Sequence, residues 1–81
     1  MTGDRRSRAN EPRDHRRMIE VARSDAHQLA RIHAIWAIGQ IARKRHELME
    51  PLLALTMDED PEIRAQAARV LGDARVQSAL D

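Results

Sequence analysis

The sequence predicts an all-α fold, a short α-solenoid of about two antiparallel helix pairs, and three observations support it. Ala, Leu, Ile, Arg and Glu dominate the composition, which is typical of helical proteins. The 81 residues include only three Gly, three Pro and one aromatic residue, Trp36, so the chain is neither loop-rich nor disordered as a whole. Residue types also recur with an offset of 33 positions, as in stacked helical repeats. A chain of this length forms at most one small domain.

The repeat matches residues at the start, along the buried face and at the end of a helix. Chance alone would not select those places so consistently, so we interpret the offset as a structural repeat. The matched pairs are Asp25 and Asp58, Arg31 and Arg64, Ala34 and Ala67, Ile38 and Leu71, and Gly39 and Gly72; Ile19 and Leu52, and Ala22 and Leu55, share the offset.

The second copy predicts a helix over residues 60–72. Asp58 or Asp60 can cap its first turn, and Pro61 suits the first helical position because its missing N–H needs no partner there. Gly72 is expected to adopt a left-handed conformation and end the helix. The apolar stripe at helical spacing consists of Ile63, Ala67, Val70 and Leu71.

The first copy predicts a helix over residues 25–43 that is apolar on two sides. Such a helix is expected to be packed between neighbours. Gly39 need not end it, because Ile41 and Ala42 continue the apolar pattern, so this glycine allows a bend or close packing. Trp36 is expected to pack between helices beside Leu29 and Ile32; the alternative is a binding anchor.

Shorter helices complete the predicted domain, which spans residues 14–81. Pro51 lies within one of them, so that helix should begin near Pro51 or kink there. The polar, Arg-rich segment 1–13 is expected to be a disordered extension. The remaining predicted helices cover residues 14–23, 46–57 and 74–80.

The segment Asp58–Asp73, which reads DEDPEIRAQAARVLGD, resembles HEAT repeats, particularly the short bacterial kind. Asp25–Gly39 resembles the same pattern less closely, with Ile35 in place of the second Ala, and the resemblance covers roughly residues 18–73. It implies helix pairs that stack into a curved solenoid whose concave face holds partners. Because about three repeats are usually needed for stability, exposed apolar ends are expected to bind neighbouring repeats or to cause self-association.

A second likeness concerns residues 33–43, which read HAIWAIGQIAR. They resemble a variant found in large bacterial proteins that combine a dehydrogenase-like propeller, HEAT repeats and a haem-binding module. This likeness implies a fragment of a longer array. The haem motif of two cysteines followed by His is absent from the sequence.

In HEAT-like repeats, the arginine at the position of Arg31 and Arg64 bonds to acidic groups at neighbouring helix starts. The resemblance therefore implies pairing of Arg31 with Asp25, and of Arg64 with Asp58 or Asp60. The alternative is a basic concave stripe in which both arginines bind a partner.

Catalytic and metal-binding patterns are lacking, so we predict a non-enzyme without cofactors. The chain has no cysteine and no phosphate-binding glycine loop. The carboxylates 58–60 lie where helix caps belong. No two histidines have the i and i+4 spacing of a metal site; they are His15, His27, His33 and His46.

The leading functional hypothesis is a protein-interaction or scaffolding segment, and two alternatives remain open. One is nucleic-acid binding through the Arg-rich segment 1–13, which a net charge of +1 and the absence of stacking aromatics disfavour. The other is an accessory region of a larger bacterial oxidoreductase. No signal peptide or membrane-spanning run is apparent, so the default expectation is the cytoplasm.

Overall fold

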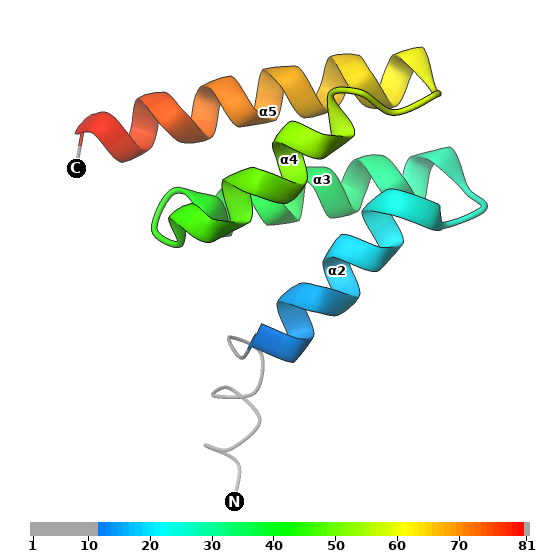
Figure 1. Ribbon diagram of the computed structural model, residues 1–81, viewed down its shortest axis with the longest axis horizontal. Helices are drawn as coiled ribbons and strands as arrows, with labels where there is room; N and C mark the ends of the chain where they lie inside the picture. Colours follow the sequence, from blue (N-terminus) through cyan, green and yellow to red (C-terminus); the bar gives the residue numbers. More distant parts are fainter. Residues whose placement is uncertain (1–11, 81) are drawn as a thin grey trace, which may run out of the picture.

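The computed structural model describes residues 12–80, which form helices and turns and contain no strand (Figure 1). This all-α architecture confirms the predicted fold class. The elements in chain order are α2 (Pro12–Ser24), α3 (Gln28–Ala42), the 3₁₀ turn η1 (His46–Leu48), α4 (Met49–Leu55) and α5 (Pro61–Leu80).

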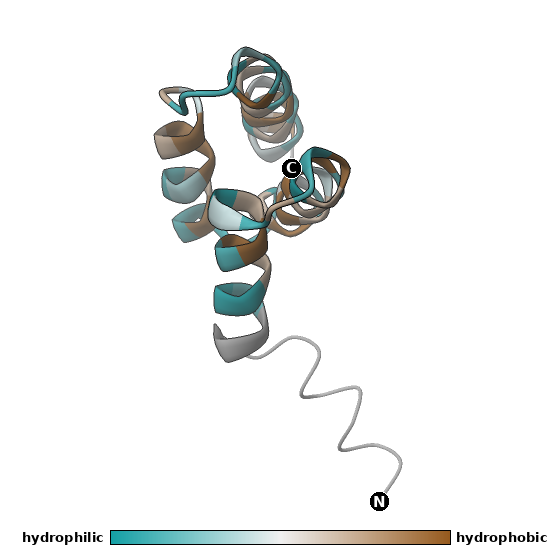
Figure 2. Ribbon diagram, turned by 90° about the vertical axis from the view of Figure 1, so that its right-hand side faces the viewer, coloured by the Kyte–Doolittle hydropathy of each residue, from teal (hydrophilic) through white to brown (hydrophobic). Residues whose placement is uncertain are grey.

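The helices form two layers, with α2 and α4 in one and α3 and α5 in the other (Figures 1 and 2). α2 packs on α3, α4 packs on α5, and α3 also contacts α5. α3 and α5 lie side by side and run in the same direction (Figure 1). Residues 12–80 therefore form two stacked helix pairs, α2 with α3 (the first repeat) and α4 with α5 (the second repeat).

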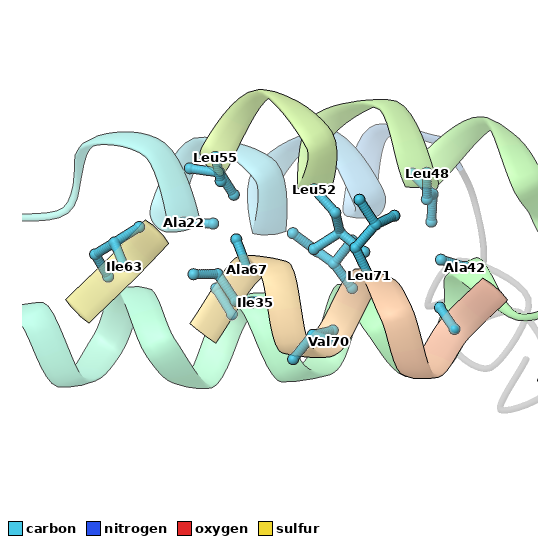
Figure 3. Close-up of a cluster of buried hydrophobic side chains, with 13 residues drawn as sticks. Ala22, Ile35, Ala42, Leu48, Leu52, Leu55, Ile63, Ala67, Val70 and Leu71 are labelled. Carbon is cyan, nitrogen blue, oxygen red and sulfur yellow. The ribbon is translucent and has the colours of Figure 1, made fainter. Parts of the chain in front are cut away.

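A hydrophobic core lies between the layers (Figure 3). Ile35, Ile38, Leu52 and Ile63 are fully buried, and burial of such a side chain stabilises the fold by about 1.5–3 kcal/mol. The repeat therefore marks core positions from both copies. Its buried members include Ala34, Ile38, Ala67 and Leu71, together with Ala22, Leu52 and Leu55.

The prediction that Gly72 ends a helix is wrong. α5 continues through Gly72 to Leu80, and Gly72 does not have a positive φ. Ala74, one turn beyond Val70, is buried in the core, so the apolar stripe continues past the glycine. A glycine inside a helix costs only about 1 kcal/mol, which the continued packing offsets. The predicted helices 60–72 and 74–80 are one helix.

Other predicted boundaries shift by a few residues. α3 begins at Gln28 because Asp25 first forms a turn, in which its Oδ1 accepts a hydrogen bond from the backbone N–H of His27 at 2.8 Å. Pro51 lies in the first turn of α4, after η1, where its missing N–H leaves no bond unmade. Of the extension predicted at 1–13, residues 1–11 lie outside the described part of the chain, whereas residues 12 and 13 belong to α2.

Gly39 is the point of close approach between α3 and α5. A Cβ added at this position would overlap Cγ1 of Val70, so the two helices pack at this distance only because residue 39 has no side chain. None of the described helices is both long enough and apolar enough to cross a membrane.

Candidate protein-interaction site

A groove runs between α3 and α5. It encloses about 340 Å³. Its apolar part includes Trp36 and Val76, and its polar part includes Gln40, Arg43, Asp73 and Gln77. We call this feature the α3–α5 groove.

Trp36 lies against the neighbouring helix α5, as packing between helices requires, but 40% of its surface is exposed, so it is not a fully buried core residue. Leu29, two turns earlier on α3, is more exposed, at 63%. The indole is nevertheless held in place, because its Nε1–H donates to Oε1 of Gln66 on α5 at 3.1 Å. A large aromatic side chain is thus fixed at the edge of an open groove.

The polar side chains of the groove offer both donors and acceptors. Nη1 of Arg43 donates to Oε1 of Gln40 at 3.3 Å. Nε of Arg43 is buried and has no hydrogen-bond partner among the described residues. Asp73 lines the same groove from α5. A peptide backbone, which presents N–H and C=O groups in alternation, could be recognised by such a set.

Arg31 joins the two repeats at one end of the molecule. Its Nη2 donates to Oδ1 of Asp58 at 2.6 Å, and its Nε donates to the carbonyl of Ala22 at 2.7 Å. The arginine and aspartate side chains are only 12% and 18% exposed. The pKa of Asp58 lies below its ordinary value because Arg31 and the backbone N–H of Asp60 donate to its carboxylate. The predicted pairing of Arg31 with Asp25 is therefore wrong.

Arg64 occupies the same repeat position but has different partners. Its Nη1 donates to the backbone carbonyls of Asp58 at 2.9 Å and of Glu59 at 3.2 Å. The predicted pairing with the carboxylate of Asp58 or Asp60 is wrong because other donors already occupy those oxygens. Arg31 donates to one carboxylate oxygen of Asp58, and the backbone N–H of Asp60 donates to the other.

Asp60 is the residue that caps α5. Its Oδ1 accepts from the backbone N–H of Glu62 at 2.8 Å, and Pro61 is the first residue of the helix, as the sequence predicts. Its Oδ2 accepts from Nε2 of Gln28 at 2.9 Å, which adds a further bond between the repeats. This bond and the Glu62 N–H lower the pKa of Asp60. The carboxylates near residue 60 thus serve helix capping and repeat contacts.

The four histidines have different environments. His15 is buried, and its Nε2 has no hydrogen-bond partner among the described residues. Nε2 of His46 lies 2.5 Å from Oγ of Ser78, which ties η1 to the end of α5. His27 and His33 are exposed. Within the described part of the chain, no group of three His, Cys, Asp or Glu side chains could hold a metal ion.

Comparison with known proteins identifies the repeats. The family model described as HEAT repeats matches residues 16–81. No curated protein and no solved structure matches the chain. The family match covers both helix pairs, including the Arg31–Asp58 contact and the α3–α5 groove. The chain belongs to the HEAT-repeat family.

Proposed function

We propose that this chain is a non-catalytic protein-binding segment that holds part of a partner protein in the α3–α5 groove, with Trp36 as the anchor. HEAT repeats generally mediate protein interaction or scaffolding, and the family is typically non-catalytic. The observation that supports this proposal is the placement of Trp36, which is 40% exposed at the groove and held by Gln66. Tryptophan is enriched among the residues that dominate binding energy at protein interfaces.

The groove favours a short amphipathic segment of the partner. An apolar side chain of that segment would pack on Trp36 and Val76, since both line the groove and are exposed. Backbone or polar side-chain groups would bond to Gln40 and Gln77, which lie beside them. Since Arg43 and Asp73 offer one charge of each sign, shape and hydrogen bonding should contribute more to recognition than net charge.

The described residues give the nucleic-acid alternative no support. Arg31 is mostly buried against Asp58, and Arg64 donates to carbonyls of its own repeat, so the two do not form a free basic stripe. The Arg-rich segment lies almost wholly outside the described residues. The alternative of an accessory oxidoreductase region depends on the likeness of residues 33–43 alone.

A peptide-selection experiment tests the proposal. The full chain would be used to select binders from a random peptide library displayed on phage, and the binders would be measured by titration calorimetry. We expect Trp36→Ala to weaken binding at least about tenfold, which corresponds to about 1.4 kcal/mol. Leu53→Ala is the matched control, because Leu53 is also a large exposed apolar residue but lies on α4 in the other layer.

Two results would contradict the groove as the binding site. One is equal binding by wild type and Trp36→Ala, and the other is an equal loss in Trp36→Ala and Leu53→Ala. Circular dichroism of each variant would establish that the helices are retained, so that a loss of binding is not a loss of fold.

A further inference from the structure

We propose that copies of this chain associate head to tail, with Arg64 of one copy bonded to Asp25 of the next. This association would repeat, between molecules, the contact that joins the two repeats within the chain. It uses the outer edge of α5 and the opposite edge of the first repeat. It is therefore independent of the α3–α5 groove and of any peptide bound there.

The contact within the chain has two main parts. Arg31 of the first repeat donates to Asp58 of the second at 2.6 Å. Gly39 of α3 leaves the space that Val70 of α5 fills. Arg31 and Gly39 thus form the receiving side of a repeat, and an aspartate before the next long helix forms the inserting side.

The second repeat presents the same receiving side outward. Arg64 and Gly72 lie 33 positions after Arg31 and Gly39. Within residues 15–80, Arg64 forms no ion pair and donates only to backbone carbonyls of its own repeat. Among the described residues, none would lie within 4 Å of a Cβ added at Gly72. In α3, Arg31 and Gly39 contact the second repeat. The equivalent residues of α5, Arg64 and Gly72, have no such contact with the described residues.

The first repeat presents a matching inserting side at the opposite edge. Asp25 lies 33 positions before Asp58 and has the same local geometry. One oxygen of each aspartate accepts the backbone N–H two residues later, at 2.8 Å from His27 and at 2.9 Å from Asp60. The other oxygen of Asp58 accepts Arg31, whereas Oδ2 of Asp25 accepts no hydrogen bond from the described residues. Oδ2 of Asp25 is thus the acceptor that Arg64 lacks.

The contact between copies should be weaker than the contact within the chain. The position of Val70 corresponds to Ala37 in the first repeat, which places a smaller side chain over Gly72. The bond from Gln28 to Asp60 has no equivalent, because the corresponding residues are Pro61 and His27. The contact uses different surfaces on its two sides, so a pair of copies leaves one of each surface free to add further copies. We expect concentration-dependent oligomers rather than a discrete dimer.

Sedimentation velocity of the full chain from about 10 µM to about 1 mM tests this proposal, because the range spans weak affinities. The weight-average sedimentation coefficient of the wild type should rise with concentration. Arg64→Asp and Asp25→Arg should each stay monomeric, since every contact would then bring like charges together. An equimolar mixture of the two variants should associate again, because each variant supplies the charge that the other needs.

A second variant separates association from folding. Gly72→Gln adds bulk where the monomer has free space and replaces glycine by a better helix former, so the fold should be retained while association is lost. Trp36→Ala, which changes the groove and not this edge, should associate as the wild type does. A wild type that is monomeric throughout, a mixture that does not associate, or a Gly72→Gln that still associates would each overturn the proposal. A monomeric wild type would leave the edge of α5 to a different partner.

Discussion

The side chain of Arg31 in the first repeat lies against that of Asp58 in the second, with 2.6 Å between Nη2 and Oδ1. Both side chains are mostly buried, so this ion pair is screened less than one on the surface. Since α3 and α5 are joined near their starts by this pair, the contact fixes how the second helix pair stacks on the first.

Replacing Arg31 by alanine should lower the free energy of unfolding by about 1–3 kcal/mol, because Asp58 loses a charged donor and the carbonyl of Ala22 loses its partner. Urea denaturation at neutral pH would measure the change. Arg64→Ala is the matched control and should cost less, about 0.5–1 kcal/mol, since its hydrogen bonds are exposed. Equal losses in the two variants would contradict the importance of the Arg31–Asp58 pair.

Stability should fall in acid through Asp58. Its pKa in the folded chain lies below the ordinary value of 3.8, because Arg31 and the N–H of Asp60 donate to the carboxylate. A lowered folded pKa contributes stability that is complete above the unfolded pKa and is lost as the pH falls through the folded pKa. The loss should therefore develop below pH 3.8.

Asp58→Asn would isolate this effect. The variant keeps a side chain of similar shape but cannot titrate, so the drop in its urea midpoint between about pH 5 and about pH 2 should be smaller than that of the wild type. Asp60 is present in both proteins, and its own titration largely cancels in the comparison. A variant whose stability declines as steeply as the wild type would show that Asp58 is not responsible.

The two glycines of the repeat should respond in opposite directions to alanine. Gly39→Ala places a methyl group against Cγ1 of Val70 and should cost about 1–3 kcal/mol through overpacking. The methyl group of Gly72→Ala meets none of the described residues, so this variant should gain about 0.5–1 kcal/mol from helix propensity. Thermal unfolding followed by circular dichroism would compare them. A gain from Gly39→Ala would mean that α3 and α5 are not closely packed at this point.

Two adjacent residues of α3, Ile35 and Trp36, should differ in how much they contribute to stability. Ile35 is fully buried, and Ile35→Ala should cost about 2–5 kcal/mol of stability. Trp36→Ala should cost less because its side chain is partly exposed. Denaturant midpoints would rank the two variants. A larger loss from Trp36→Ala would identify Trp36 as a core residue and weaken its role as an anchor.

The repeat offset was sufficient to predict the fold and most of the core. Ala34, Ile38, Ala67 and Leu71 are all buried, because a residue that recurs at the same helical position in stacked pairs faces the same neighbours. The offset could not predict where α5 ends. A glycine commonly ends a helix by adopting a positive φ, which Gly72 does not, and the burial of Ala74 favours continuation.

The differences between prediction and structure at Trp36 and Arg64 have related causes. Helical spacing shows that α3 is apolar on two sides, yet it does not show whether a neighbour covers the side of Trp36. The resemblance to HEAT repeats implied that Arg64 pairs with Asp58 or Asp60, but competition among donors decides which acceptor it reaches. That competition depends on Arg31 and Gln28, which come from the other repeat.

The position of Trp36 gives the molecule a built-in optical reporter. The sequence contains no Tyr or Phe, so ultraviolet emission arises from this one indole. Its Nε1–H bridges to Gln66 across the junction of the two repeats, and its ring borders the groove. Separation of the repeats would hydrate the ring and shift its emission to longer wavelength, whereas a ligand in the groove would shift it to shorter wavelength. The direction of the emission shift would thus distinguish separation of the repeats from ligand binding in the groove, without an added label.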